Sequence, residues 1–328
     1  MALRDSFIAG RDDDGKRVDR VVRRLLGDVP LSAVFKALRT GSVRVNGRKP
    51  QPADRVREGD AFAITDLRFA AASAPTASTT PTFSGARDRG GEAAPDLARL
   101  IILETEDLIF LNKPRGVLSH GPGGLDESVL AYLSYKAGKS LSFAPAPLHR
   151  LDRNTTGLLV ASKTLRGARA FSAALQDRTV EKRYIAVLRG RLDRKDHWVD
   201  SLERLSKQRR TLRSALSVHR KAVTLVEPIA ANGAFTLADI RILTGLTHQI
   251  RAQAALRGRP LAGDVKYGGG AEPHGYILHA YRLDFPEEFE ADAPRTVIAP
   301  VPEDTALRLR ERFGPKILLS APPGIIPP

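Results

Sequence analysis

The residues best suited to chemistry stand together in one segment of this 328-residue chain, HRLDRNTTGLLV, from His149 to Val160. Its carboxylate, Asp152, lies in a polar run directly before an apolar strand pattern, and loops held by rigid strands often carry function. Arg150 and Arg153 flank Asp152 and would favour its ionised form. An ionised carboxylate without a metal partner can act as a nucleophile or a base. An aspartate beside arginines is also typical of a surface salt bridge, so the segment alone leaves both interpretations open.

Other familiar catalytic patterns are missing from the sequence. There is no GxxxxGK[ST] phosphate loop, no GxGxxG after a strand in a βαβ unit, no HExxH and no G-x-S-x-G elbow. The absence of cysteine removes disulfides, Cys-ligated zinc and a thiolate nucleophile, and the seven histidines show no metal-ligand spacing. We therefore expect a protein that uses neither a metal nor a cofactor.

The charge of the chain predicts a polyanionic partner. Lys and Arg number 52 against 37 Asp and Glu, a net charge of +15. Such an excess is typical of nucleic-acid binding, although a basic surface can also serve solubility. No apolar run is long enough to span a bilayer and the N-terminus lacks the apolar core of a secretory signal, so we expect a cytoplasmic protein. The sequence does not define an oligomeric state, and we expect a monomer.

The elements that must position these residues fall into two parts. The stretch 67–97 is rich in Ala, Ser, Thr, Pro and Gly and is typical of a flexible linker. The part before it, 16–66, is a small basic unit with 12 Lys and Arg against 6 Asp and Glu. The part after it, 98–315, mixes strand and helix patterns without regular alternation. This predicts an α+β catalytic domain with a mostly antiparallel sheet rather than a doubly wound parallel fold.

The small unit is predicted to hold two helices and two strands. A helix with one apolar face covers 18–26, and a second one is capped by Ser32 and ends at Gly41. Two short strands, VRVNG and AFAIT, follow. The runs RVDRVVRRLL, LSAVFKALRTGSVRVNG and VREGDAFAI resemble the S4 RNA-binding domain. The resemblance implies contacts to RNA phosphates, with ordinary solvated charges as the alternative, by Arg39, Arg44, Arg48 and Lys49.

The segment HRLDRNTTGLLV resembles the HRLDxxTSG motif of the RluA-type pseudouridine synthases. Five further segments agree with that family in the order it requires: NKPRG, KRY, TGLTHQIR, GDVKYG and LHA. The similarity covers about 98–305, and six segments in order over such a length are not a chance match. With the S4-like unit in front, the arrangement is most similar to the large-subunit rRNA synthases of the RluC kind.

The resemblance implies an isomerase that cleaves the N-glycosidic bond of a uridine, turns the base and rejoins it through carbon. It implies 23S rRNA as the partner, with a tRNA-directed synthase or a non-catalytic ribosome-assembly factor as alternatives. Asp152 would be the essential carboxylate, which either adds to the sugar or abstracts a sugar proton. Tyr184 would stack on the base and help to remove a proton, unless it is a core tyrosine. Arg251 would pair with Asp152 and orient it, unless it is a helix-surface arginine.

The target base must leave its stack before its glycosidic bond can be reached. Arg150 is the candidate to fill the vacated space, because its flat guanidinium can stack on bases. The resemblance implies that further residues shape the substrate pocket or contact the backbone rather than do chemistry: His149, Lys113, Thr247 and His248.

Four positions depart from the family pattern. Leu246 stands where the family usually has Arg, and Gln253 where His is common. Thr156 replaces a usual Ser, and Arg115 is bulkier than the usual residue before the glycine. The lost cation at 246 would weaken one RNA contact or alter site choice, while the proposed catalytic residues are intact. The Pro-rich tail ILLSAPPGIIPP has no assigned role.

Overall fold

The structure is a computed structural model, and it describes residues 5–26, 29–65, 95–134, 140–205, 210–213, 221–320 and 322–325. The chain forms two compact units, one of Met1–Glu92 with Leu130–Pro145 and one of Ala93–Val129 with Ala146–Pro328. The predicted linker 67–97 lies outside the described residues except for its last three. The predicted boundaries 16–66 and 98–315 stay predictions. Within the described ranges, no helix is long and apolar enough to cross a membrane.

The first unit packs two helices on a small antiparallel sheet. Its elements are β1 (Asp5–Ile8), η1 (Arg11–Asp13), α1 (Val18–Leu25), α2 (Leu31–Thr40), β2 (Val43–Val45) and β3 (Ala61–Ile64). The strand order is β1-β3-β2, and β1 was not among the predicted strands. The predicted apolar face of α1 is confirmed, since Val18, Val21 and Val22 are buried in the same core as Val34 and Phe62.

The ends of α2 test two predictions about helix capping. Gly41 ends the helix as predicted, with a left-handed φ of 76° and its N–H on the Leu38 carbonyl at 3.2 Å. The prediction that Ser32 is the N-cap is wrong. The helix begins at Leu31 after Pro30, which has no side chain that could accept a hydrogen bond.

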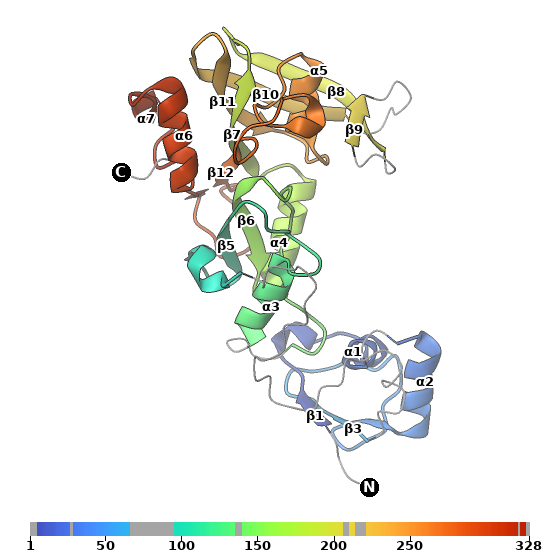
Figure 1. The fold of residues 1–328 in the computed structure, drawn as a ribbon. Coiled ribbons are helices and arrows are strands. Elements are labelled where there is room, and N and C mark those ends of the chain that lie inside the picture. The colour runs from blue at the N-terminus through green and yellow to red at the C-terminus, as the bar shows by residue number, and fades with distance from the viewer. Residues whose placement is uncertain are drawn as a thin grey trace. The chain divides into compact units, whose positions relative to one another are not determined.

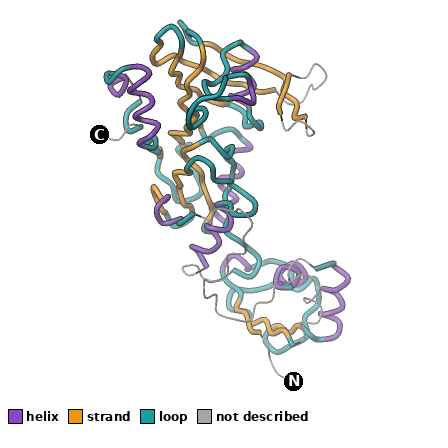
Figure 2. Tube along the Cα trace, viewed as in Figure 1, coloured by secondary structure: helices purple, strands orange, loops and turns teal. Residues whose placement is uncertain are grey.

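The second unit is built around one sheet that holds ten strands within the described residues (Figures 1 and 2). The strands are β4 (Ile101–Glu104), β5 (Leu108–Lys113), β6 (Thr156–Ser162), β7 (Glu181–Arg189), β8 (Asp196–Leu205), β9 (Arg210–Arg213), β10 (Lys221–Ala231), β11 (Phe235–Ile242), β12 (Leu278–Asp284) and β13 (Thr296–Ile298). The order is β4-β5-β6-β12-β7-β11-β10-β8-β9, with β13 beside β12. Among the strands that the structure describes, only β6 and β12 pair in parallel, which agrees with the predicted mostly antiparallel sheet.

Helices and short 3₁₀ turns pack around this sheet. They are η2 (Leu97–Leu100), α3 (Leu125–Ser134), α4 (Leu165–Gln176), α5 (Gln249–Leu256), η3 (Val265–Tyr267), α6 (Glu303–Phe313) and α7 (Ile317–Ser320). Thr164 caps α4 by accepting the Gly167 N–H at 3.0 Å. Phe171 of α4 is buried against Leu158 and Val160 of β6, beside which α4 lies in Figure 1. This packing fixes β6, the strand that follows the polar turn at 150–155.

Candidate active site

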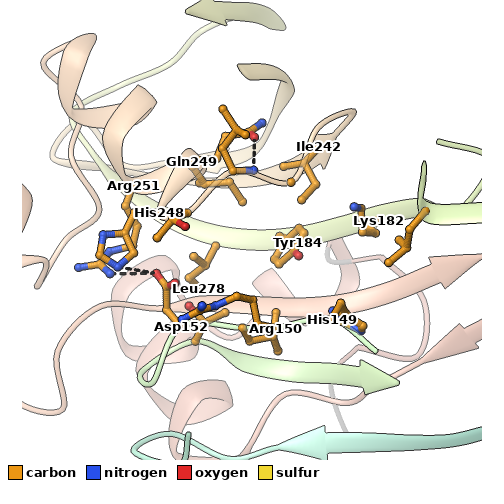
Figure 3. Close-up of a pocket in the computed structure, with 17 residues that line it drawn as sticks. His149, Arg150, Asp152, Lys182, Tyr184, Ile242, His248, Gln249, Arg251 and Leu278 are labelled. Atoms are coloured by element: carbon orange, nitrogen blue, oxygen red, sulfur yellow. Dashed lines mark hydrogen bonds and ion pairs between the residues drawn. The ribbon is translucent and has the colours of Figure 1, made fainter. Parts of the chain in front are cut away.

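The segments with the predicted chemical residues meet at one pocket in the second unit (Figure 3). The pocket has a volume of about 420 Å³. Its walls come from the turn before β6, the start of β7, the end of β11, the loop 245–248 and the start of α5. Asp152 is the only carboxylate among the described residues that line it. The pocket therefore combines one acidic group with several cationic and apolar ones.

Asp152 and Arg251 form an ion pair, as predicted. Arg251 Nη1 donates to Asp152 Oδ2 at 2.9 Å (Figure 3). The other edge of the guanidinium donates to both oxygens of Asp264, from Nε at 2.7 Å and from Nη2 at 2.9 Å. Burial opposes the charge of Arg251, but the hydrogen bonds and charge of Asp264 outweigh it and raise the pKa of Arg251 above its usual range. One permanent cation thus links a buried carboxylate to the carboxylate in the pocket.

Two tyrosines complete the surroundings of Arg251. Its guanidinium carbon lies 4.7 Å from the ring centre of Tyr276 and 5.1 Å from that of Tyr267. Stacking of this kind favours a planar cation. Neither these rings nor the role of Asp264 was predicted. The only sequence signal was the GDVKYG segment, which contains Asp264 and Tyr267 but does not show that they enclose Arg251.

The turn that carries Asp152 is held through its backbone. The Ser119 hydroxyl accepts the Leu151 N–H and donates to the Leu151 carbonyl, both at 3.1 Å. The Thr155 N–H donates to the Asp152 carbonyl at 3.0 Å. Lys113 Nζ donates to three carbonyls, those of Pro114, Val117 and Arg153, at 2.8–3.0 Å.

The position of Lys113 corrects a prediction. Lys113 was expected to shape the substrate pocket or contact the backbone. Its side chain is fully buried and does not line the pocket, and its ammonium contacts protein backbone carbonyls. Its ammonium bonds the loop after β5 to the turn that carries Asp152. Burial lowers the pKa of Lys113 to about 7, although the charge of Asp152 acts in the opposite direction. In this structure Lys113 orders the turn and does not reach a ligand.

The TTG sequence after the turn is explained by the close approach of β6 and β12. Gly157 has φ +106°, and a Cβ at this position would lie 2.1 Å from the Ala280 carbonyl oxygen. The Thr156 hydroxyl and His279 Nδ1 are 2.8 Å apart, and His279 Nε2 donates to the Ala299 carbonyl at 3.0 Å. Burial lowers the pKa of His279 to about 4, so the ring is neutral and Nδ1 accepts from Thr156.

Tyr184 and Lys182 reach the pocket from the same face of β7, since they are two residues apart on one strand. Tyr184 is 7% exposed. Burial and the nearby charge of Asp152 raise the pKa of Tyr184 well above its usual range. Its phenol is therefore protonated at neutral pH.

The two pocket histidines are both neutral at pH 7. His149 Nε2 accepts the Val160 N–H at 3.0 Å, and burial lowers the pKa of His149 to about 3. His248 Nδ1 lies 2.9 Å from the Tyr267 hydroxyl, and burial lowers the pKa of His248 to about 4. Both rings line the pocket, but the hydrogen bond of His149 uses the nitrogen that would accept a proton.

Glutamines fix the loop before α5 and the helix itself. Gln249 Oε1 accepts from the Thr244 hydroxyl and from the Leu246 N–H at 2.8 and 3.0 Å. Gln253 is fully buried, and its amide contacts Asp200 at 2.7 Å. The departure at Gln253 therefore lies behind the helix, where it joins α5 to β8, and outside the pocket. The departure at Leu246 gives the pocket an apolar side chain.

The other predicted site residues fall into two places. Arg150 is exposed at the pocket and Thr247 lines it. The four cations predicted to contact RNA phosphates are exposed in the first unit and do not line the pocket around Asp152: Arg39, Arg44, Arg48 and Lys49. Within the part of the chain that the structure describes, no group of three or more His, Asp or Glu side chains is arranged to hold a metal ion.

Known proteins are similar to this chain in sequence and in fold. Residues 107–256 match the family model for RNA pseudouridylate synthase. The ribosomal large subunit pseudouridine synthase C of Escherichia coli O157:H7 is 30% identical over 294 residues, 84% of this chain and 86% of that protein. The protein of the same name from Vibrio vulnificus is 29% identical over 307 residues, 89% of this chain and 92% of that protein. The structure of human RNA Pseudouridylate Synthase Domain Containing 4 has a TM-score of 0.54 at 20% identity and covers 65% of this chain and 93% of that one.

Together, the pocket in a mixed sheet and these similarities define a class of RNA-modifying enzyme. The chain belongs to the RNA pseudouridylate synthase family and is an RNA pseudouridine synthase, an isomerase.

Proposed function

We propose that the protein converts uridine to pseudouridine in large-subunit (23S) rRNA, with Asp152 as the reacting carboxylate. The observation that carries the proposal is the Asp152–Arg251 ion pair, in which the pocket's single acidic side chain is oriented by a buried cation. The pocket volume of about 420 Å³ is in the range of small-ligand sites. The names of the relatives from Escherichia coli and Vibrio vulnificus support the large ribosomal subunit as the source of the substrate.

The reaction breaks the bond between uracil N1 and ribose C1′, turns the base and forms a bond from C5 to C1′. C5 then releases its proton, and N1 takes one up. Asp152 either adds to the sugar or removes a sugar proton, and both steps need the ionised carboxylate that Arg251 stabilises. Tyr184 serves as a surface on which the uracil stacks. Tyr184 is also proposed to help remove the C5 proton once the base has rejoined the sugar, as the family resemblance implies.

The target uridine is proposed to leave its stack and enter the pocket, because its glycosidic bond is otherwise out of reach. Arg150 is exposed at the pocket and can stack in the space that the base leaves. His149, Thr247 and His248 are proposed to shape the pocket around the nucleotide.

The first unit is proposed to be an S4-like module that docks RNA. Its two helices and the turn between β2 and β3 agree with the order of elements in the resemblance. The four predicted cations on and after α2 are exposed and can contact phosphates.

The experiment uses RNA tritiated at uridine C5, because formation of pseudouridine releases that tritium. Unmodified 23S rRNA and bulk tRNA are incubated in parallel with the purified full-length enzyme. Release from 23S rRNA supports the proposal, and sequencing of the product then maps the modified uridine. Release from tRNA alone would overturn the proposed substrate and keep the reaction. Retained RNA binding with no release from either RNA would contradict the proposed function.

A further inference from the structure

Lys182 is a pocket cation to which the proposed reaction assigns no role. Its side chain is half-buried and lines the pocket from the start of β7, where Lys182 is the second residue. Burial lowers the pKa of Lys182, and no carboxylate among the described residues offsets that effect. The other pocket cation with a buried charge, Arg251, is bonded to two carboxylates. A half-buried ammonium without an acidic partner costs free energy, so a ligand oxygen is its natural complement.

The position of Lys182 relative to Asp152 indicates which ligand oxygen this is. Figure 3 shows Asp152 and Lys182 on opposite sides of Tyr184. Lys182 and Tyr184 are two residues apart on one strand face, or about 7 Å. A nucleotide with its ribose at Asp152 and its base on Tyr184 directs the far edge of the base toward Lys182. In uracil, the group opposite N1 is the C4 carbonyl.

We propose that Lys182 donates a hydrogen bond to O4 of the target uracil and so recognises uracil and stabilises it as a leaving group. This inference rests on the proposed function. When the N1–C1′ bond breaks, its electron pair goes to the ring and is shared with O2 and O4. The charge is removed when C5 bonds to C1′, and the later loss of the C5 proton is balanced by uptake of a proton at N1. The hydrogen bond from a fixed ammonium to O4 is stronger when the ring is charged than when it is neutral. This difference accelerates the chemical step.

The same contact selects uracil over cytosine. Cytosine has an amino group at C4, which would place a second donor against the ammonium. A site built to donate to a carbonyl rejects an analogue that lacks the acceptor, because the buried polar group is then unpaired. The pocket wall beside Lys182 includes Ile242 and Gly245, neither of which offers a side-chain acceptor.

The test is a cycle of two changes, one in the enzyme and one in the RNA. The enzyme change is Lys182→Met, and the RNA change is sulfur for O4 of the mapped uridine in a synthetic fragment. Conversion is measured under single turnover by chromatography of the digested nucleosides. Lys182→Met is expected to lower the maximal rate about 10²–10³-fold, the usual effect of losing one such donor. It is also expected to leave the melting temperature unchanged or higher, since no ion pair is lost.

The expected result is that the sulfur substitution slows wild type and has little further effect on Lys182→Met. The same substitution at O2 should slow both enzymes equally. The control variant is Lys221→Met, an exposed lysine of a neighbouring hollow that Lys182 also borders, and its maximal rate should equal that of wild type. An equal sulfur effect at O4 in wild type and Lys182→Met would overturn the inference. So would a raised KM with an unchanged maximal rate, the result expected for a phosphate contact. Inactive wild type would instead refute the proposed function.

Discussion

Replacement of Arg251 by lysine separates the two tasks of this residue. The guanidinium bonds Asp152 through Nη1 and Asp264 through Nε and Nη2. A lysine ammonium keeps the positive charge but has no planar fork, so it cannot hold both carboxylates in this geometry. Asp264 is 1% exposed, whereas the side chain of Asp152 is 18% exposed. The ammonium should therefore stay with Asp264, because a buried uncompensated charge costs about 3–5 kcal/mol.

The expected loss then equals the single hydrogen bond between residue 251 and Asp152. A hydrogen bond to a charged group contributes about 1.5–3 kcal/mol. If that contribution is made in the transition state, Arg251→Lys lowers the maximal rate roughly 10- to 200-fold, at 1.36 kcal/mol per factor of ten. KM should change less than about threefold, because no RNA contact is removed.

The assay is single-turnover tritium release at saturating 23S rRNA, with a melting curve for each variant. Arg257→Lys is the matched control, since Arg257 also bonds a carboxylate, Asp200 at 2.8 Å, but does not line the pocket. Its rate should stay within about twofold of wild type. A rate for Arg251→Lys within threefold of wild type would refute the idea that this hydrogen bond orients Asp152.

Three further predictions concern stability and RNA binding. Gly157→Ala should destabilise the protein by about 3 kcal/mol or more, because the new Cβ would lie 2.1 Å from a backbone oxygen. Gly116→Ala, with open space around the new Cβ, should cost only about 1 kcal/mol. Equal losses of stability in thermal unfolding would contradict this prediction. Burial lowers the pKa of His279 to about 4, so the unfolded chain takes up the proton first as the pH falls. The contribution of this residue to stability, about 3 kcal/mol, is complete above about pH 6.5 and is lost by about pH 4. Denaturant titrations should show this acid loss in wild type and a weaker one in His279→Gln. The last prediction concerns alanine at the four exposed cations of the first unit, Arg39, Arg44, Arg48 and Lys49. In filter binding, the slope of log affinity against log salt concentration should become shallower by up to about 3. An unchanged slope would exclude phosphate contacts by these residues.

Local patterns predicted much of the site because its main parts are short segments with strong signals. The polar turn before β6 and the TGLTHQIR segment that carries Arg251 were both identified from sequence. Asp152 and Arg251 are 99 positions apart, so their contact followed only from the family resemblance. The 2.9 Å hydrogen bond between them confirms it. Spacing along the chain cannot establish such a contact, because it depends on how β6, β12, β7 and β11 are ordered in the sheet.

The features that sequence reasoning missed depend on side-chain direction and on long-range packing. Asp264 is a buried counter-ion only because its loop lies against α5. Lys113 was expected at the substrate, but its side chain turns into the protein and bonds backbone carbonyls. The strand β1 lies before the predicted unit 16–66, and it exists because β3 offers an edge with which to pair.

The most direct measurement of the central claim is tritium release by Asp152→Asn at saturating 23S rRNA, compared with wild type in a single turnover. The substitution keeps the size of the side chain and removes its charge, and melting curves and RNA affinity verify the fold. We expect a rate at least about 10⁴-fold below wild type, as for loss of an essential reacting group. Asp193→Asn, an exposed carboxylate outside the pocket, should react like wild type. Release by Asp152→Asn within tenfold of wild type would contradict the assignment of Asp152 as the reacting carboxylate.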